Sequence, residues 1–207
     1  MKVGIVNYGM GNLGSVRRAF EDLGASVFVA THPSALHDAD RIVLPGVGAF
    51  SHGMAKLQAG GWCAVLRELE SDRQRPLLGI CLGMQMLASR GDEGGDHPGL
   101  SLIEGQVRHL DTLGCQMRVP HVGWNDISFA ASEPLFAHVP QGSDFYFVHS
   151  FAFVADDPGD VVARTDYGVP VVAAVRRRHV FGTQFHPEKS SKAGRQLLRN
   201  FLDYVPC

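Results

Sequence analysis

Short apolar runs alternate with segments of helical periodicity over the first ninety residues of the chain. Four such runs predict buried strands, at residues 3–7, 26–30, 41–44 and 76–80. Apolar side chains recur at helical spacing in two segments between them, at residues 13–23 and 57–69, and a further helix follows Cys81. This alternation predicts a parallel sheet with helices packed on both of its faces.

The second half of the chain is dominated by strands. Six apolar runs predict them, at residues 103–109, 117–127, 145–154, 161–165, 171–176 and 179–185, before a closing helix at 190–204. The loop between the last two strands is too short for a crossover, so that pair is antiparallel. A segment rich in glycine and aspartate, at 89–99, is expected to be a mobile loop. We therefore predict a three-layer α/β fold in one domain over residues 1–207, with a mixed, mostly parallel central sheet and an antiparallel C-terminal portion.

Composition narrows the class of protein without identifying its chemistry. The 19 basic and 21 acidic side chains leave a net charge of −2, which gives no electrostatic reason to expect nucleic acid or an anionic membrane as a partner. No apolar run is long enough to span a bilayer. The four cysteines are scattered without a Cys-x-x-Cys pair, so neither a disulfide framework nor a cysteine metal cage is expected, and a reducing cytoplasm is the natural setting.

The most informative segment is Gly79-Ile80-Cys81-Leu82-Gly83, which lies between a predicted strand and a predicted helix. A Gly-x-Cys-x-Gly turn in this position is the cysteine form of a nucleophile elbow, in which the glycines let neighbouring segments approach closely. A free thiol is only a few per cent ionised at neutral pH, and a helix N-terminus alone stabilises a thiolate too little. The elbow therefore requires a nearby histidine. The alternative, a small buried hydrophobic side chain, is the commoner use of a free cysteine, and Cys63, Cys115 and Cys207 have no elbow around them.

A candidate base follows the last predicted strand, in the segment His186-Pro187-Glu188. Pro187 disfavours a helical conformation at His186, and in an extended segment residues two apart point to the same side. Glu188 can then hold one imidazole nitrogen while the other faces Cys81, which is the arrangement of nucleophile, base and orienting group. A zinc-deaminase interpretation of His-x-Glu fails because the chain has no Pro-Cys-x-x-Cys segment, and we expect no metal or cofactor.

Acyl-transfer chemistry at such a site also needs donors for an oxyanion. The backbone N–H of Leu82, directly after the nucleophile, is one natural donor, and the amide of Val47 in the glycine-rich segment 45–50 is the second candidate. A plain strand-ending turn explains that segment equally well. Gln85 lies one helical turn beyond Cys81 on the same face, where it either binds a substrate held on the cysteine or is simply solvated.

Together these segments resemble the class I, triad-type glutamine amidotransferase family, and the resemblance runs nearly end to end. The elbow and the His-Pro-Glu segment are common to that family. Four features resemble one branch of it, the glutaminase subunits of imidazole glycerol phosphate synthase: Pro45-Gly46-Val47-Gly48, Met84, Gly123-Trp124-Asn125 and Lys189-Ser190. One position departs from the pattern, since many relatives have tyrosine where this chain has Phe151, which removes any contact made through that hydroxyl.

The resemblance implies an activity and a substrate. L-glutamine is expected to be hydrolysed to glutamate and ammonia through a glutamyl thioester on Cys81, with His186 as the acid and base and Glu188 as its orienting group. Substrate contacts are expected at Gly48, Gln85 and Ser150.

The resemblance also implies a partner, a (β/α)₈-barrel cyclase in a heterodimer with this chain. The cyclase would receive the ammonia and form imidazole glycerol phosphate and an aminoimidazole carboxamide ribotide. Asn12, Trp124, Tyr146 and Lys189 match positions at that subunit interface, although on burial statistics alone the two aromatic residues are core positions. The family's glutaminases are typically quiet until the synthase binds its ligand, and a peptide flip at Gly46–Val47, which glycine makes inexpensive, would complete the oxyanion hole.

Three alternatives belong to other classes of function. The segment Gly9-Met10-Gly11-Asn12-Leu13-Gly14 fits a dinucleotide fingerprint, but the next predicted strand ends at residues 30–33 without the acidic residue that binds ribose. A catalytically idle interaction domain would keep the fold, although the intact Cys81, His186 and Glu188 argue against it. A sister amidotransferase, such as the anthranilate synthase subunit, usually has Pro-Gly-Pro-Gly and a histidine after the elbow glycine, where this chain has Val47 and Met84.

Overall fold

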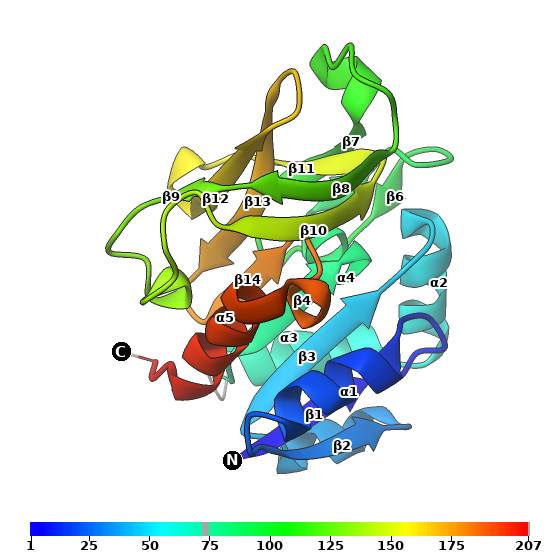
Figure 1. Ribbon diagram of the computed structural model, residues 1–207. Coiled ribbons are helices and arrows are strands. Elements are labelled where there is room, and N and C mark those ends of the chain that lie inside the picture. Colours follow the sequence, from blue (N-terminus) through cyan, green and yellow to red (C-terminus); the bar gives the residue numbers. More distant parts are fainter. Residues whose placement is uncertain (72–74, 207) are drawn as a thin grey trace.

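The computed structural model describes residues 1–71 and 75–206, so Cys207 lies outside the described residues. A central sheet runs through the molecule in the order β2-β1-β3-β4-β14-β13-β12-β9 (Figure 1). Its strands are β1 (Lys2–Val6), β2 (Ser26–Ala30), β3 (Arg41–Gly46), β4 (Leu77–Cys81), β9 (Ser128–Phe129), β12 (Val161–Asp166), β13 (Pro170–Arg177) and β14 (Val180–Thr183). Neighbouring strands are parallel from β2 to β14 and antiparallel from β14 to β9, which confirms the predicted mixed sheet.

Helices cover both faces of this sheet, as predicted (Figure 1). One layer holds α1 (Leu13–Glu21) and α5 (Ser191–Asp203), and the other holds α2 (Phe50–Ala59), α3 (Trp62–Ser71) and α4 (Leu82–Met86). Short 3₁₀ helices complete the helical elements: η1 (Pro33–Asp38), η2 (Leu110–Leu113), η3 (Pro134–Phe136), η4 (Pro158–Asp160) and η5 (Pro187–Lys189). No helix within residues 1–71 and 75–206 combines the length and the apolar character needed to cross a bilayer.

The central strands are buried on both sides because their side chains alternate between two hydrophobic cores. Ile5 and Val43 pack with Phe20 and Phe201 of α1 and α5. Ile42 and Leu44 point to the other side, in the core that also contains residues of α2, α3 and α4. Strands buried in this way form continuous apolar runs, which is why the sequence located them well.

The single helix expected at 57–69 is two helices. Gly60 and Gly61 separate α2 from α3, and Gly61 has a φ of +71° in the left-handed region that side chains rarely adopt. A Cβ at Gly60 would also come within 2.6 Å of the Trp62 ring. Apolar periodicity continues across the break, so periodicity alone did not reveal it.

Two smaller sheets lie beside the central one and were not predicted. One pairs β8 (His121–Asp126) with β10 (Asp144–His149), and the other has the order β11-β7-β5-β6. Its strands are β5 (Arg90–Gly91), β6 (His97–Pro98), β7 (Gly105–His109) and β11 (Phe151–Ala155), so the segment expected as a loop at 89–99 contains two short strands. The strand expected at 145–154 is divided at Ser150, because β10 pairs with β8 and β11 pairs with β7.

The register of the parallel strands brings three chain segments to one edge of the central sheet. Gly46 at the end of β3 is the Cα partner of Cys81 at the end of β4, and Thr183 of β14 is the partner of Ile80. The loops that follow these strands therefore start next to each other. In open α/β sheets, ligands bind at the carboxyl ends of the strands, and the candidate residues gather at that edge.

Candidate active site

Cys81 occupies a sharp turn between β4 and α4. Its backbone has φ 54° and ψ −110°, a positive φ that is uncommon for a residue other than glycine. A Cβ at Gly83 would lie 1.8 Å from the carbonyl oxygen of Leu44, and one at Gly79 would lie 2.7 Å from the backbone of Gly83. The glycines are thus required for close backbone packing on both sides of Cys81, which confirms the predicted elbow.

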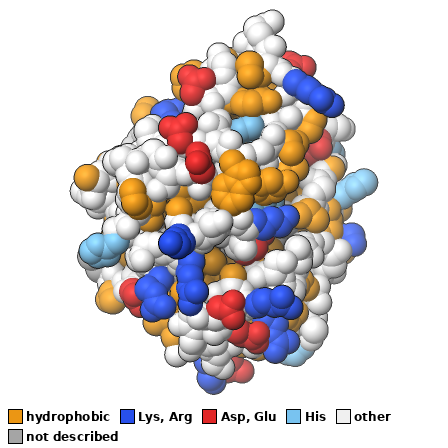
Figure 2. Space-filling view, viewed as in Figure 1, with side chains coloured by type: hydrophobic (Ala, Val, Ile, Leu, Met, Phe, Trp, Pro, Cys, Tyr) orange, Lys and Arg blue, Asp and Glu red, His pale blue; other side chains and the backbone are white. Residues whose placement is uncertain are grey.

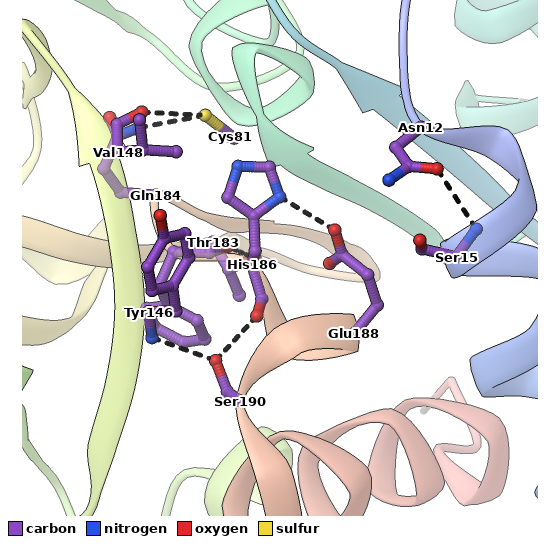
Figure 3. A network of polar contacts seen from close by, with 11 residues as sticks. Asn12, Ser15, Cys81, Tyr146, Val148, Thr183, Gln184, His186, Glu188 and Ser190 are labelled. Carbon is purple, nitrogen blue, oxygen red and sulfur yellow. Dashed lines mark hydrogen bonds and ion pairs between the residues drawn. The ribbon is translucent and has the colours of Figure 1, made fainter. Parts of the chain in front are cut away.

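His186 and Glu188 form a buried pair beside the elbow. The Nδ1 atom of His186 is 2.8 Å from Oε1 of Glu188, and the imidazole lies between the Glu188 and Cys81 side chains (Figure 3). The predicted extended conformation holds for His186, but Pro187 starts the 3₁₀ helix η5, so Glu188 reaches back from a helical turn rather than from a strand. The pairing is therefore as expected, while the backbone that produces it is different.

The environment of His186 favours its protonated form. Burial lowers the pKa of His186, but the nearby Cys81 and the hydrogen-bonded Glu188 more than offset it and raise the pKa to about 9. The imidazole consequently holds a proton at neutral pH. A proton held next to a nucleophile and a buried carboxylate suits a general acid that later returns as a base.

Ser190 ties the His186 segment to β10, a role that the sequence did not indicate. Its hydroxyl donates to the carbonyl oxygen of His186 at 2.6 Å and accepts from the backbone N–H of Tyr146 at 3.0 Å (Figure 3). The N–H of His186 in turn donates to the carbonyl oxygen of Tyr146. Ser190 is fully buried, so these contacts fix the position of the imidazole relative to β10.

A cleft of about 270 Å³ opens in front of the thiol. Besides Cys81 and His186, the predicted residues that line it come from three segments: Val47, Gly48, Leu82, Gln85 and Ser150. This volume lies just below the usual range for ligand pockets, about 300–1,000 Å³, and is suited to a single amino acid.

Glu93 also lines this cleft and was missed by the sequence analysis. Its Oε2 atom accepts the backbone N–H of Phe50, the first residue of α2, at 2.7 Å. Glu93 comes from the segment expected as a mobile loop, where nothing in the local pattern marks one acidic residue among several. Only the fold brings it to the cleft.

The amide of Gln85 is engaged by the protein itself. Its Nε2 donates to the carbonyl oxygen of Phe151 at 2.9 Å and to Oε1 of Gln184 at 3.1 Å. Gln184 is completely buried, and its Nε2 lies 3.8 Å from the Sγ atom of Cys81. Gln85 therefore has its side-chain carbonyl left for a substrate, and Gln184 is a second residue that the sequence did not single out.

Two buried histidines continue this network, and His149 also lines the cleft. Nδ1 of His149 is 2.8 Å from the carbonyl oxygen of Phe151 and must donate to it, so Nε2 of His149 accepts from Nδ1 of His121 at 3.0 Å. The remaining nitrogen of His121 then accepts from the side-chain amide of Asn125, at 3.4 Å. Burial lowers the pKa of His149 to about 3 and that of His121 to about 4. Both rings are neutral, with fixed tautomers.

The four predicted interface residues lie on one face of the molecule. Trp124 and Tyr146 are paired across β8 and β10, and their rings meet edge to face with the ring centres 6.0 Å apart. The ammonium of Lys189 lies 5.6 Å from the centre of the Tyr146 ring. Trp124 is 53% exposed, so its interpretation as a core residue is wrong. Asn12 caps α1 by accepting the N–H of Ser15 (Figure 3) and shares a groove of about 620 Å³ with Lys189.

Apolar side chains gather on one part of this face, and basic side chains with acidic ones among them gather on another (Figure 2). Figure 2 shows hydrophobic side chains over β8 and β10, where Val122 and Val148 are exposed beside Trp124. Basic side chains lie next to them over α1 and α5, where Arg18 and Arg195 border the groove (Figure 2). An exposed apolar area bordered by charges is typical of a protein interaction surface.

Comparison of the sequence with known proteins shows the family to which the chain belongs. The family model for class-I glutamine amidotransferases matches residues 4–205. A protein of Halobacterium salinarum described as imidazole glycerol phosphate synthase subunit HisH is 50% identical over 208 residues, covering 97% of this chain and 92% of that protein. The same description belongs to a protein of Moorella thermoacetica that is 45% identical, with 98% and 95% covered.

Solved structures agree on the fold. A crystal structure described as glutamine amidotransferase superposes with a TM-score of 0.77 at 20% identity, covering 97% of both chains. A structure of PurLQS from Thermotoga maritima gives a TM-score of 0.75 at 21% identity, covering 98% of both. At these identities the likeness concerns the fold alone.

Proposed function

The chain belongs to the class I glutamine amidotransferase family, and from that membership we propose the reaction and the residues that carry it. It is a glutamine amidotransferase of histidine biosynthesis. L-glutamine is hydrolysed to glutamate and ammonia through a thioester at Cys81. The observation that carries this assignment is the strained elbow of Cys81 beside the buried His186–Glu188 pair.

The chemistry divides into two acyl transfers. The Cys81 thiolate attacks the side-chain carboxamide of glutamine, and a C–S bond forms while the carbonyl oxygen becomes an oxyanion. His186 gives its proton to the amine, the C–N bond breaks and ammonia leaves the glutamyl thioester. His186 then takes a proton from water, which attacks the thioester and releases glutamate and the thiolate. Glu188 keeps the imidazole oriented throughout through its contact with Nδ1.

The oxyanion is stabilised by backbone N–H groups on either side of the cleft. Leu82 supplies one at the start of α4, and Val47 supplies the other once the Gly46–Val47 peptide turns its N–H into the cleft. The pairing of Gly46 with Cys81 brings this peptide next to the nucleophile. We expect contact with the partner to turn this peptide, so that glutamine hydrolysis becomes fast only in the complex with the synthase.

Glutamine itself is recognised by the groups that line the cleft. Gly48, Ser150 and the side-chain carbonyl of Gln85 hold its polar ends. The carboxylate of Glu93 faces the same space and complements the α-ammonium group of an amino acid. A cleft of this size with one carboxylate selects an amino-acid amide over a nucleotide.

The partner is a (β/α)₈-barrel cyclase, with which the chain forms a heterodimer in the cytoplasm. The face formed by Asn12, Trp124, Tyr146 and Lys189 is the docking surface, and it borders the segment that carries His186. Ammonia passes across this interface to the cyclase, where the ring-forming chemistry takes place. A partner docked at this surface contacts β10, and β10 is joined to the His186 segment by hydrogen bonds.

Glutamate release measured with and without the cyclase and its nucleotide ligand tests the proposal. The wild-type chain is expected to hydrolyse glutamine rapidly only in the ligand-bound complex. Cys81→Ala is expected to abolish this activity, and Cys63→Ala, which changes a buried cysteine of α3 away from the cleft, is the matched control. Activity that survives Cys81→Ala would exclude the thioester mechanism, and a wild type that is inactive in every combination would exclude this synthase as the partner.

A further inference from the structure

Tyr8 carries a buried hydroxyl group that the proposed reaction does not use. The residue follows β1, and its side chain is only 6% exposed. Its hydroxyl is fully buried, and no hydrogen-bond partner for it exists among residues 1–71 and 75–206. A buried polar group without a partner destabilises the folded state, and phenylalanine would fill the same space without that cost. An unpaired hydroxyl therefore points to a second state in which it is paired.

The surroundings of this hydroxyl identify the candidate acceptor. A Cβ built on Gly46 would lie 2.6 Å from the Tyr8 oxygen, 2.9 Å from Cβ of Leu82 and 3.0 Å from the amide nitrogen of Gly83. The hydroxyl thus lies against Gly46 at the end of β3, just before Val47 and next to the elbow. Any side chain at residue 46 would occupy this contact, which is a reason for glycine there beyond flexibility.

The hydroxyl is available as a donor. Burial, followed by the nearby charge of Cys81, raises the pKa of Tyr8, so the phenol keeps its proton at all physiological pH values. Tyr8 is not among the residues that line the cleft, so its hydroxyl does not reach a bound glutamine. Its oxygen lies 2.6 Å from the position that a Gly46 Cβ would occupy, outside the lining of the cleft.

Peptide geometry connects these two observations. The C=O and N–H of a trans peptide point in opposite directions, so one cannot enter the cleft unless the other turns away from it. When the Gly46–Val47 peptide turns its N–H into the cleft, the carbonyl oxygen of Gly46 turns to the buried side, which is where the Tyr8 hydroxyl lies. A carbonyl moved to that side without a donor would itself be unsatisfied.

We propose that Tyr8 is a positioning residue of the oxyanion site, whose hydroxyl donates to the carbonyl oxygen of Gly46 when the Gly46–Val47 peptide is in its active orientation. This inference rests on the proposed glutaminase function. Tyr8 then destabilises the resting state by its unpaired hydroxyl and stabilises the active state by one hydrogen bond. It acts through the Val47 amide, without touching glutamine.

Tyr8→Phe removes this hydroxyl and nothing else, so it separates positioning from packing. In the ligand-bound complex with the cyclase, the variant is expected to lose about tenfold in kcat for glutamine hydrolysis, with KM unchanged. The isolated variant is expected to melt at the same temperature as the wild type or at a higher one. A structural role alone would lower the melting temperature and leave kcat of the folded enzyme unchanged.

Tyr204→Phe is the matched control, because the hydroxyl of Tyr204 is paired with Arg176 and with the carbonyl oxygen of Arg178, far from the elbow. It is expected to melt lower than the wild type and to keep its stimulated kcat. A stimulated kcat of Tyr8→Phe equal to that of the wild type overturns the role of Tyr8 alone. A wild type that shows no stimulated hydrolysis overturns the proposed function, and the role of Tyr8 with it.

Discussion

The two sides of the cleft are built in different ways. On the fixed side, which consists of Gln85, His121, His149 and Gln184, every side chain is buried and joined by hydrogen bonds in a chain that ends at Cys81. On the loose side, which consists of Tyr8 and residues 46–48, the hydroxyl of Tyr8 has no partner among the described residues and Val47 is 43% exposed.

This difference separates two tasks of the site. A nucleophile benefits from being held in place at all times, because each lost contact there misplaces the reacting atom. An oxyanion donor that must wait for a partner has to be able to move, and a segment held by few hydrogen bonds keeps the energy of that movement small. In the proposed mechanism, the fixed side keeps the nucleophile in position and the loose side lets the partner control hydrolysis.

The largest effect is expected from a change at the elbow, where backbone packs on backbone. Gly83→Ala places a Cβ 1.8 Å from the carbonyl oxygen of Leu44, and neither group is at the end of a flexible side chain. We expect a loss of more than about 4 kcal/mol in the free energy of unfolding, measured by denaturant titration, together with loss of glutamine hydrolysis.

Gly14→Ala is the matched control for this change. Gly14 lies in α1 and a Cβ there meets no atom within 4 Å, so alanine should stabilise the isolated chain by about 0.5–1 kcal/mol. Equal stability of Gly83→Ala and the wild type would show that the close packing around the elbow is not required.

The second effect is the dependence of stability on pH, because the pKa values of the site histidines are shifted in opposite directions. His149 and His121 have a pKa lowered to about 3 and about 4 by burial, so their contribution to stability is complete above pH 6.5 and is lost as pH falls. Between pH 6.5 and 5 the unfolded chain binds protons that the folded chain does not. We expect a loss of about 3 kcal/mol over this interval in the free energy of unfolding.

His186 is expected to have the opposite effect on the pH dependence of the free energy of unfolding, on the alkaline side. Its pKa is raised to about 9, mainly by Cys81 and Glu188 against the effect of burial, so its contribution is complete below pH 6.5 and is lost as pH rises towards 9. Stability should therefore be greatest near pH 6.5. His186→Asn is expected to flatten the alkaline limb and to leave the acid limb unchanged. An acid limb that is flat in the wild type would show that the two buried rings are protonated in the folded state.

The sequence predicted the parts of the site that depend on local chain geometry. The elbow was recognisable because a glycine lies two positions before Cys81 and another two positions after it, with a strand before the turn and a helix after it. His186 and Glu188 were recognisable because two residues separated by proline form a local motif. The central strands were found because burial on both faces makes each of them a continuous apolar run.

What the sequence missed depends on contacts between segments far apart in the chain. Gln184 meets Cys81 across 103 positions and His149 meets His121 across 28, and no periodicity reports such a pairing. The break between β10 and β11 at Ser150 was not predicted for a similar reason, since both strands are apolar and only their partner strands differ. The orphan hydroxyl of Tyr8 is a property of the packed structure, because a tyrosine after a strand has no distinguishing pattern.

The smallest effect on stability is expected at Val47. Variants of this residue test whether the loose side of the cleft affects activity without contributing to stability. Val47→Ala truncates a residue that is 43% exposed and should change the free energy of unfolding by less than about 0.5 kcal/mol. Since the proposed oxyanion donor is the backbone N–H, this variant should keep its stimulated kcat at saturating partner. Val47→Pro removes that N–H and should lower the stimulated kcat by about 10²–10³-fold.

The pair of variants distinguishes a mobile backbone donor from a passive turn. Thermal melting of both variants, followed by glutamate release in the ligand-bound complex, gives the two quantities side by side. If the loop only ended β3, proline would affect activity no more than alanine, and the Val47 amide would have no part in the reaction. A large loss in Val47→Pro alone, without a matching loss of stability, means that the least stabilising segment of the cleft controls its chemistry.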